Sequence, residues 1–252
     1  MPEIILGTLR IPTFFLVISL SLSFLLVYLS KRVDQFGKER KFTFDLAILI
    51  MVAAFLGGRL MHVFYEEWDY YFKAPIQILY FWNGGFVFFG GMIASWLAAW
   101  SFCRLRKKSF TEWADFFTPL LSLSHALGRL GCFFAGCCYG STCFLPWAVE
   151  TRHPTALYMV LGELIIFVYL LFAEKRVRPK GQLFMMWVFL HSCLRFYVEF
   201  FRADFRGDFY NLPLLGRLSI SQLICLGFVL ISAAYIILSS ESLKKLYNRR
   251  PS

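Results

Sequence analysis

Long runs of apolar residues, separated by short polar and charged segments, dominate the pattern of this 252-residue chain. A bilayer core about 30 Å thick needs roughly 20 apolar residues in a helix, and seven runs are long enough. Their approximate bounds are 11–30, 44–65, 81–102, 116–136, 155–173, 183–201 and 219–238. The pattern predicts an all-α integral membrane protein with about seven transmembrane helices, folded as a single polytopic membrane domain over residues 1–252.

The fourth run is the least regular of the seven. Glycines at 128, 131, 136 and 140 interrupt it, and Arg129 lies among them. Backbone that leaves a helix at membrane depth is tolerated only where it is buried in protein or lines a cavity. We therefore expect a broken fourth helix beside such a cavity. The first run has no cleavage pattern after it, so we expect it to stay as a helix.

The composition agrees with a membrane protein. Hydrophobic residues make up 58% of the chain and charged residues 17%, whereas soluble domains carry about 25% charged residues. This excludes a soluble enzyme, a disordered chain and a secreted disulfide scaffold. A net charge of +10 in a soluble protein would suggest a nucleic-acid partner. Because the charges lie in loops between apolar runs, we expect no nucleic acid.

The basic residues also predict the orientation. Four alternate loops hold 17 Lys and Arg residues, and the loops on the other side hold six. The basic loops are 31–41, 104–108, 175–180 and 244–250. Cytoplasmic loops are the ones enriched in Lys and Arg. We therefore expect a periplasmic N-terminus and a cytoplasmic C-terminus in the cytoplasmic (inner) membrane of a bacterium.

Three arginines remain inside the apolar runs: Arg59, Arg129 and Arg195. An arginine at the centre of a membrane helix costs about 2.5–3.5 kcal/mol. Such residues indicate a functional site unless they reach an interface, and Arg59 lies near an outer helix end. Arg129 is flanked by glycines, and a guanidinium beside exposed backbone amides suits a phosphate or another oxyanion.

The sixth run carries a stripe of polar residues along one side. His191, Arg195, Glu199 and Arg202 are spaced by four, four and three residues, which places them on one helical face. A carboxylate can orient a neighbouring guanidinium and leave its other donors for an anion. The alternative is a structural ion pair between helices. His153, just before the fifth run, is a candidate general base near neutral pH.

The cysteine spacing argues against a metal centre. The local pattern C-x4-C-C-x4-C, residues 132–143, matches neither zinc nor iron–sulfur ligand spacing. We therefore predict no metal and no cofactor. A disulfide from Cys137 or Cys138 to Cys143 would fit an oxidising periplasm.

Seven short motifs occur in order over more than two thirds of the chain. They are GGR at 57–59, FWNGG with a following GG at 81–91, DFFTPL at 115–120, GRLG at 128–131, RHPTALY at 152–158, RFYVEFFR at 195–202 and LSISQ at 218–222. Together they resemble the bacterial prolipoprotein diacylglyceryl transferases.

The resemblance implies an enzyme that moves the diacylglyceryl group of phosphatidylglycerol onto the thiol of a lipobox cysteine. The acceptor is the signal peptide of a preprolipoprotein, and glycerol phosphate is released. We expect membrane lipid as the other partner and a monomeric state. By position, the catalytic candidates are Arg129, Arg195, Glu199 and His153. The substrate-binding candidates are Arg202, Arg59, His191, Asn83, Gly90, Gly91 and Gly140.

The chain departs from the family pattern at several positions. Phe89 replaces the histidine of FHGG, Cys132 replaces an asparagine, Cys137 an acidic residue, and His191 a tyrosine. With Phe89 in place, His153 or His191 is left as the base. From the residues alone, two other functions stay open, which are transport of an anionic lipid or metabolite and a membrane thiol oxidoreductase using the cysteines.

Overall fold

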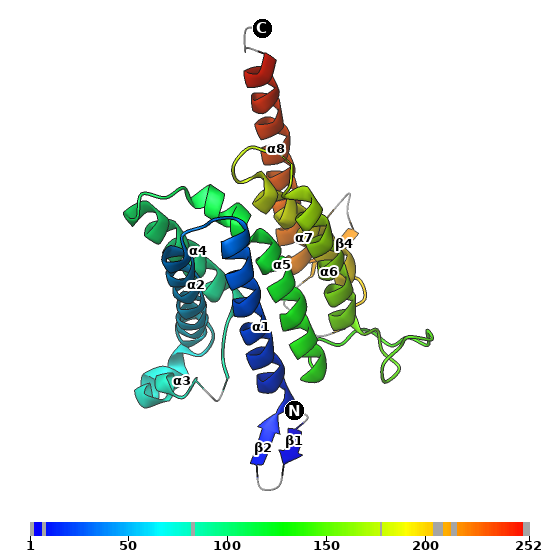
Figure 1. Ribbon diagram of the computed structural model, residues 1–252. Helices are drawn as coiled ribbons and strands as arrows, with labels where there is room; N and C mark the ends of the chain where they lie inside the picture. Colours follow the sequence, from blue (N-terminus) through cyan, green and yellow to red (C-terminus); the bar gives the residue numbers. More distant parts are fainter. Residues whose placement is uncertain are drawn as a thin grey trace. The chain divides into compact units, whose positions relative to one another are not determined.

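The computed structural model describes residues 3–6, 9–81, 84–176, 178–203, 209–212 and 216–248. Its elements, in chain order, are β1 (Glu3–Leu6), β2 (Leu9–Pro12), α1 (Thr13–Gln35), α2 (Arg40–Met61), the π-helix η1 (His62–Glu66), α3 (Trp68–Lys73), the 3₁₀ helix η2 (Pro75–Leu79), α4 (Phe88–Leu105), α5 (Phe110–Phe134), α6 (Thr155–Ala173), α7 (Gln182–Glu199), β3 (Phe209–Leu212), β4 (Gly216–Ser219) and α8 (Ile220–Asn248) (Figure 1). The strands form two antiparallel hairpins, β1–β2 and β3–β4.

The protein is mostly helical, which confirms the predicted all-α class. Within the described ranges, five helical segments are long and apolar enough to cross a membrane. They lie in α1, α2 with η1, α4, α6 and α8. Helices α5 and α7 have 25 and 18 residues but carry the polar residues of the candidate site.

Among the helix starts, the predicted and observed bounds differ most at α4. Helix α6 begins and ends where the apolar run predicts, whereas α4 begins at Phe88 instead of residue 81. Gly84 and Gly85 have φ values of +85° and +80°. These left-handed conformations are readily adopted by glycine and do not continue a right-handed helix, so residues 84–87 lie outside α4.

The prediction of a broken fourth helix is wrong. Helix α5 runs without interruption from Phe110 to Phe134 and includes Gly128, Gly131 and Pro119. A glycine costs only about 1 kcal/mol relative to alanine inside a helix, too little to open one. The chain leaves the helix only after Phe134, and Gly136 then adopts a φ of +69°.

The chain folds as two compact units, one of residues 29–110 and the other of residues 1–28 with 111–252. In the first unit, α2 packs on α4 through small residues. A Cβ atom added at Gly57 would lie 2.5 Å from the Gly90 carbonyl oxygen, and one at Gly91 would lie 2.8 Å from that of Ala54. Glycine is therefore needed here because the two backbones approach so closely.

Helices α5 to α8 make up most of the second unit. Ile166, Leu170, Ala173 and Leu183 form a buried cluster where α6 meets α7. Asp115, near the start of α5, accepts hydrogen bonds from Gly181 N (2.6 Å) and Phe184 N (2.9 Å). A carboxylate that accepts these free amides stabilises the N-terminus of α7 and fixes it against α5.

Candidate active site

The last turn of α7 and the residues just after it bring together one carboxylate and two guanidinium groups. Arg195 Nη1 donates to Glu199 Oε2, and Arg202 Nε lies 3.8 Å from the same oxygen. All three side chains are less than 10% exposed. The spacing predicts this arrangement for Arg195, Glu199 and Arg202. Two guanidinium groups thus lie beside one carboxylate oxygen.

The start of α8 holds the other oxygen of Glu199. Ser219 Oγ donates to Glu199 Oε1 (3.1 Å) and accepts from Gln222 N (3.2 Å), while Gln222 Oε1 accepts from Ser219 N (2.9 Å). This reciprocal pair is a capping box. It explains the LSISQ sequence, and it orients Glu199 with both oxygens occupied. Sequence reasoning noted the motif but assigned Ser219 and Gln222 no role.

The segment between α5 and α6 is anchored to the end of α7. Gly140 and Arg202 form an isolated antiparallel bridge. Gly140 N donates to His153 O (3.0 Å), and Ser141 N donates to Phe201 O (2.8 Å). The structure therefore places the predicted residues Gly140, His153 and Arg202 beside one another.

The position of Gly140 leaves no room for a side chain. An added Cβ would lie 2.5 Å from His153 O and 2.6 Å from Phe201 O. We expect Gly140→Ala to force these segments apart, lowering the free energy of unfolding by about 1–3 kcal/mol and reducing activity. Denaturant unfolding in detergent and a turnover assay measure the two effects. Gly128→Ala is the matched control because nothing lies within 4 Å of its Cβ position. Equal results for the two variants would contradict the close packing.

Aromatic side chains surround His153. Its Nδ1 lies 3.0 Å from the Tyr158 hydroxyl, which also accepts from Trp147 Nε1 (3.0 Å). The His153 and Phe201 rings are 5.0 Å apart. Tyr158 thus orients the imidazole through one nitrogen and leaves Nε2 for a proton-transfer role.

Arg129 lies on α5, five residues before the helix ends at Phe134. It is partly buried, and its Nη1 is 3.9 Å from Cys138 Sγ. Cys138 is two residues before Gly140, and its carbonyl accepts a hydrogen bond from Thr155 Oγ1 (2.6 Å). These contacts connect Arg129 to the same loop that meets Arg202.

His191 does not join the arginine cluster. Its Nδ1 contacts Oε1 of Glu163 on α6, and His125 Nδ1 lies 3.4 Å from the same oxygen. Oε2 of Glu163 accepts from Ser122 Oγ (2.8 Å) and Trp187 Nε1 (3.3 Å). Glu163 is fully buried. Sequence reasoning missed this cluster, although the only acidic residue in the run 155–173 is Glu163.

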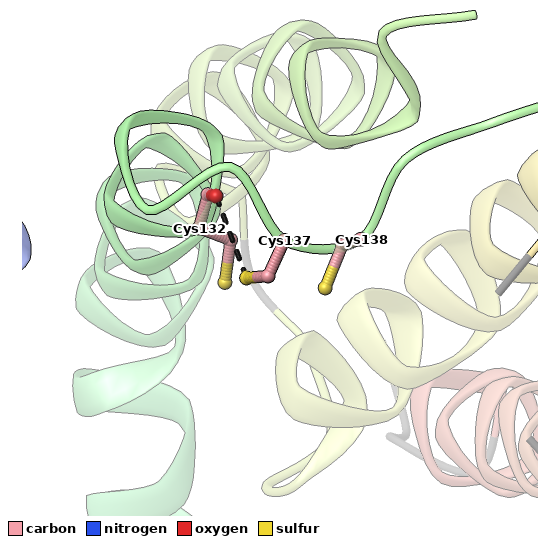
Figure 2. A group of neighbouring side chains, drawn as sticks. All are labelled: Cys132, Cys137 and Cys138. Carbon is pink, nitrogen blue, oxygen red and sulfur yellow. Dashed lines mark hydrogen bonds between the residues drawn. The ribbon is translucent and has the colours of Figure 1, made fainter. Parts of the chain in front are cut away.

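Three cysteines gather at the end of α5 (Figure 2). Cys132, Cys137 and Cys138 place their sulfur atoms within 4.8 Å of one another. All three are free thiols, as is Cys143, so neither Cys137 nor Cys138 forms the disulfide to Cys143 that the sequence left open. Cys143 N donates to Thr151 O (2.9 Å), which holds this residue in a separate turn. Partial burial and the neighbouring thiol of Cys138 raise the pKa of the Cys137 thiol.

The unit of residues 29–110 holds the other predicted site residues. Arg59 is 6% exposed, and its guanidinium donates to backbone carbonyls of η2 and of residues between η2 and α4. The acceptors are Gln77 (2.8 Å), Ile78 (3.2 Å), Tyr80 (3.4 Å), Gly84 (2.5 Å) and Gly85 (3.2 Å). Asn83 lies outside the described residues. Gly90 and Gly91 face the backbone of α2.

These contacts give Arg59 a measurable role in stability. We expect Arg59→Ala to lower the free energy of unfolding by about 2–4 kcal/mol, since hydrogen bonds to a charged group contribute about 1.5–3 kcal/mol each and are not additive. Denaturant unfolding in detergent measures the loss. The control is Arg104→Ala, which removes an exposed guanidinium stacked on Trp100. Unchanged stability with lost activity would favour lipid contact by Arg59 instead.

Comparisons with known proteins agree with the motifs. The family model described as prolipoprotein diacylglyceryl transferase matches residues 3–238. A phosphatidylglycerol–prolipoprotein diacylglyceryl transferase of Finegoldia magna is 34% identical over 191 residues, 74% of each chain. One of Aromatoleum aromaticum is 34% identical over 217 residues, 82% of this chain and 81% of its own. The chain therefore belongs to the prolipoprotein diacylglyceryl transferase family.

Proposed function

We propose that this protein transfers the sn-1,2-diacylglyceryl group from phosphatidylglycerol to the thiol of the lipobox cysteine of a preprolipoprotein. The bond between a glyceryl carbon and the phosphate oxygen breaks, and a thioether bond forms at that carbon. The thiol loses its proton to a base, and glycerol phosphate leaves. The names of the relatives support this reaction.

The arrangement of Arg195, Glu199 and Arg202 carries the proposal. The phosphate changes from a singly charged diester to a more highly charged monoester as the bond breaks. Preorganised guanidinium groups in a water-poor site stabilise charge that develops in this way. Glu199 orients the guanidinium groups of Arg195 and Arg202, which favours a fixed pair of donors for the phosphate.

We assign the other catalytic roles to Arg129 and His153. Arg129 contacts the loop that meets Arg202, which favours a second phosphate contact from α5. His153 is our candidate base, oriented by Tyr158. His191 is the other candidate, and its bond to Glu163 would orient it in the same manner. Comparing His153→Asn with His191→Asn separates the two, because loss of the base lowers kcat more than loss of a structural contact.

Substrate binding extends beyond these residues in our proposal. In our proposal, Arg202 and Gly140 bind the headgroup side of the lipid. Arg59, Asn83, Gly90 and Gly91 are separate substrate-binding candidates within the unit of residues 29–110. The contacts of Arg59, Gly90 and Gly91 described above favour a structural role for these residues over direct contact with lipid.

We propose that both units belong to one polytopic domain of the bacterial inner membrane. The polar helices α5 and α7 would cross the bilayer together with the five apolar segments, with a periplasmic N-terminus and a cytoplasmic C-terminus. Helices lined by polar residues cross membranes where these residues face the protein interior. We further propose that the protein works as a monomer.

The reaction can be tested directly. Purified protein in phosphatidylglycerol vesicles is incubated with a lipobox peptide, and mass spectrometry follows the diacylglyceryl thioether. We expect product with the cysteine peptide and none with a serine peptide or with phosphatidylcholine vesicles. Folded protein that yields no thioether would overturn the proposal.

A further inference from the structure

The three thiols at the end of α5 form a compact set of metal ligands that the transfer reaction does not use. Cys132 lies in the last turn of α5, and Cys137 and Cys138 lie in the following loop. Their sulfur atoms are within 4.8 Å of one another, and the three side chains point to the same side of the loop in Figure 2. Soft metal ions such as Cu⁺ and Zn²⁺ prefer thiolate ligands.

The loop is held in the conformation that gathers the sulfurs. Gly136 and Cys138 have φ values of +69° and +62°. A left-handed backbone at a residue other than glycine costs on the order of 1–3 kcal/mol and persists only where its surroundings impose it. Here, Thr155 Oγ1 donates to Cys138 O (2.6 Å) and Cys137 N donates to Cys132 O (3.2 Å). The ligands are therefore positioned before any ion binds.

One cation near the sulfurs favours thiolate ligands. Arg129 Nη1 lies 3.9 Å from Cys138 Sγ, and a neighbouring guanidinium favours the deprotonated thiol. The raised pKa of Cys137 has the opposite effect. Since a bound cation replaces the thiol protons, binding removes this cost and releases a proton from each ligand.

We propose that Cys132, Cys137 and Cys138 form a three-thiolate binding site for a soft metal ion of the Cu⁺ and Zn²⁺ class. The site has room for solvent, because Cys137 is exposed and the other two cysteines are partly exposed. A Zn²⁺ ion would complete its four-coordinate shell with water or another ligand. The cysteine spacing in the sequence does not predict this site. The sulfurs are brought together by the turn at Gly136 and not by a Cys-x2-Cys segment.

The test is metal binding to the reduced, purified protein in detergent, with no lipid substrate or peptide. Zn²⁺, and in a separate arm Cu⁺ under anaerobic conditions, is titrated against a chromophoric chelator of known affinity. We expect one ion to bind per chain in at least one arm, with protection of the three thiols from alkylation. Cys137→Ser and Cys138→Ser should each weaken binding by about tenfold or more, since even outer-shell changes cost 10–100-fold.

Cys193→Ser is the matched control. This cysteine is also exposed but lies on α7, outside the cluster, so its variant should bind like the wild type. Thermal unfolding of each variant shows that lost binding does not reflect lost folding. Three outcomes would overturn the site: no stoichiometric binding of either ion, equal loss in Cys193→Ser, or a disulfide within the trio that persists in the reduced protein. Because no substrate is present, these results are independent of the transferase assay.

Discussion

Replacing Arg195 by alanine is expected to lower kcat of the transfer reaction by about 10²–10³-fold, the usual effect of removing one preorganised donor to a developing anion. Arg195 is 8% exposed and its guanidinium is fixed by Glu199, so it would not need to reorganise as the phosphate gains charge. The measurement is the initial rate of thioether formation at saturating phosphatidylglycerol, corrected for the folded fraction.

A second variant separates phosphate binding from simple charge balance. If Arg195 served only to neutralise Glu199, removing both charges would relieve the defect. We therefore expect the double variant Arg195→Ala/Glu199→Gln to stay inactive. Recovery to within a few-fold of the wild type would contradict the phosphate role, and a double-mutant cycle reports the coupling between the two residues.

Arg104→Ala provides the control for loss of a basic residue as such. Arg104 is exposed at the end of α4, where its guanidinium stacks on Trp100, so its activity should match the wild type. If Arg195→Ala retained more than about a third of the rate, the arginine could not supply the several kcal/mol that this mechanism asks of it.

The sequence predicts the contacts among Arg195, Glu199 and Arg202 well because these residues are close in the chain. Spacings of three and four residues place side chains together on any helix, and the structure shows the expected contacts among Arg195, Glu199 and Arg202. The same reasoning fails for His191. It shares the spacing, but its partner Glu163 lies 28 residues away in the sequence, and helical periodicity carries no information on which neighbouring helix covers a given side chain.

The glycines show a second limit of predicting structure from this sequence. Four glycines near Arg129 suggest a broken helix, yet Gly128 and Gly131 lie within α5, and only Gly136, after its end, adopts a positive φ. A glycine permits a left-handed conformation but does not impose it. At Gly140, tertiary contacts with His153 and Phe201 leave no room for another residue. These contacts cannot be inferred from the sequence alone.

Glu163 offers the largest expected effect on stability. We expect Glu163→Ala to lower the free energy of unfolding by about 3–5 kcal/mol, the range for breaking one side of a buried charged network. The carboxylate is fully buried and is contacted by Ser122 from α5 and by His191 and Trp187 from α7. Its removal leaves His191 and Trp187 without this acceptor, while Ser122 keeps only the backbone carbonyl of residue 163 (2.9 Å), at a position where three helices meet. Denaturant unfolding in detergent measures the loss.

Glu112→Ala is the matched control for this variant. Glu112 pairs with Lys180 at 3.0 Å, but both side chains are well exposed, so the pair should contribute about 0–1 kcal/mol.

Glu163→Gln keeps the shape and one acceptor oxygen but replaces the other by an NH₂ group, which faces donors on either side. We therefore expect an intermediate loss. If Glu163→Ala unfolded like Glu112→Ala, the cluster would not hold the helices together, and the orienting of His191 would become the remaining reason to bury a carboxylate in an apolar helix.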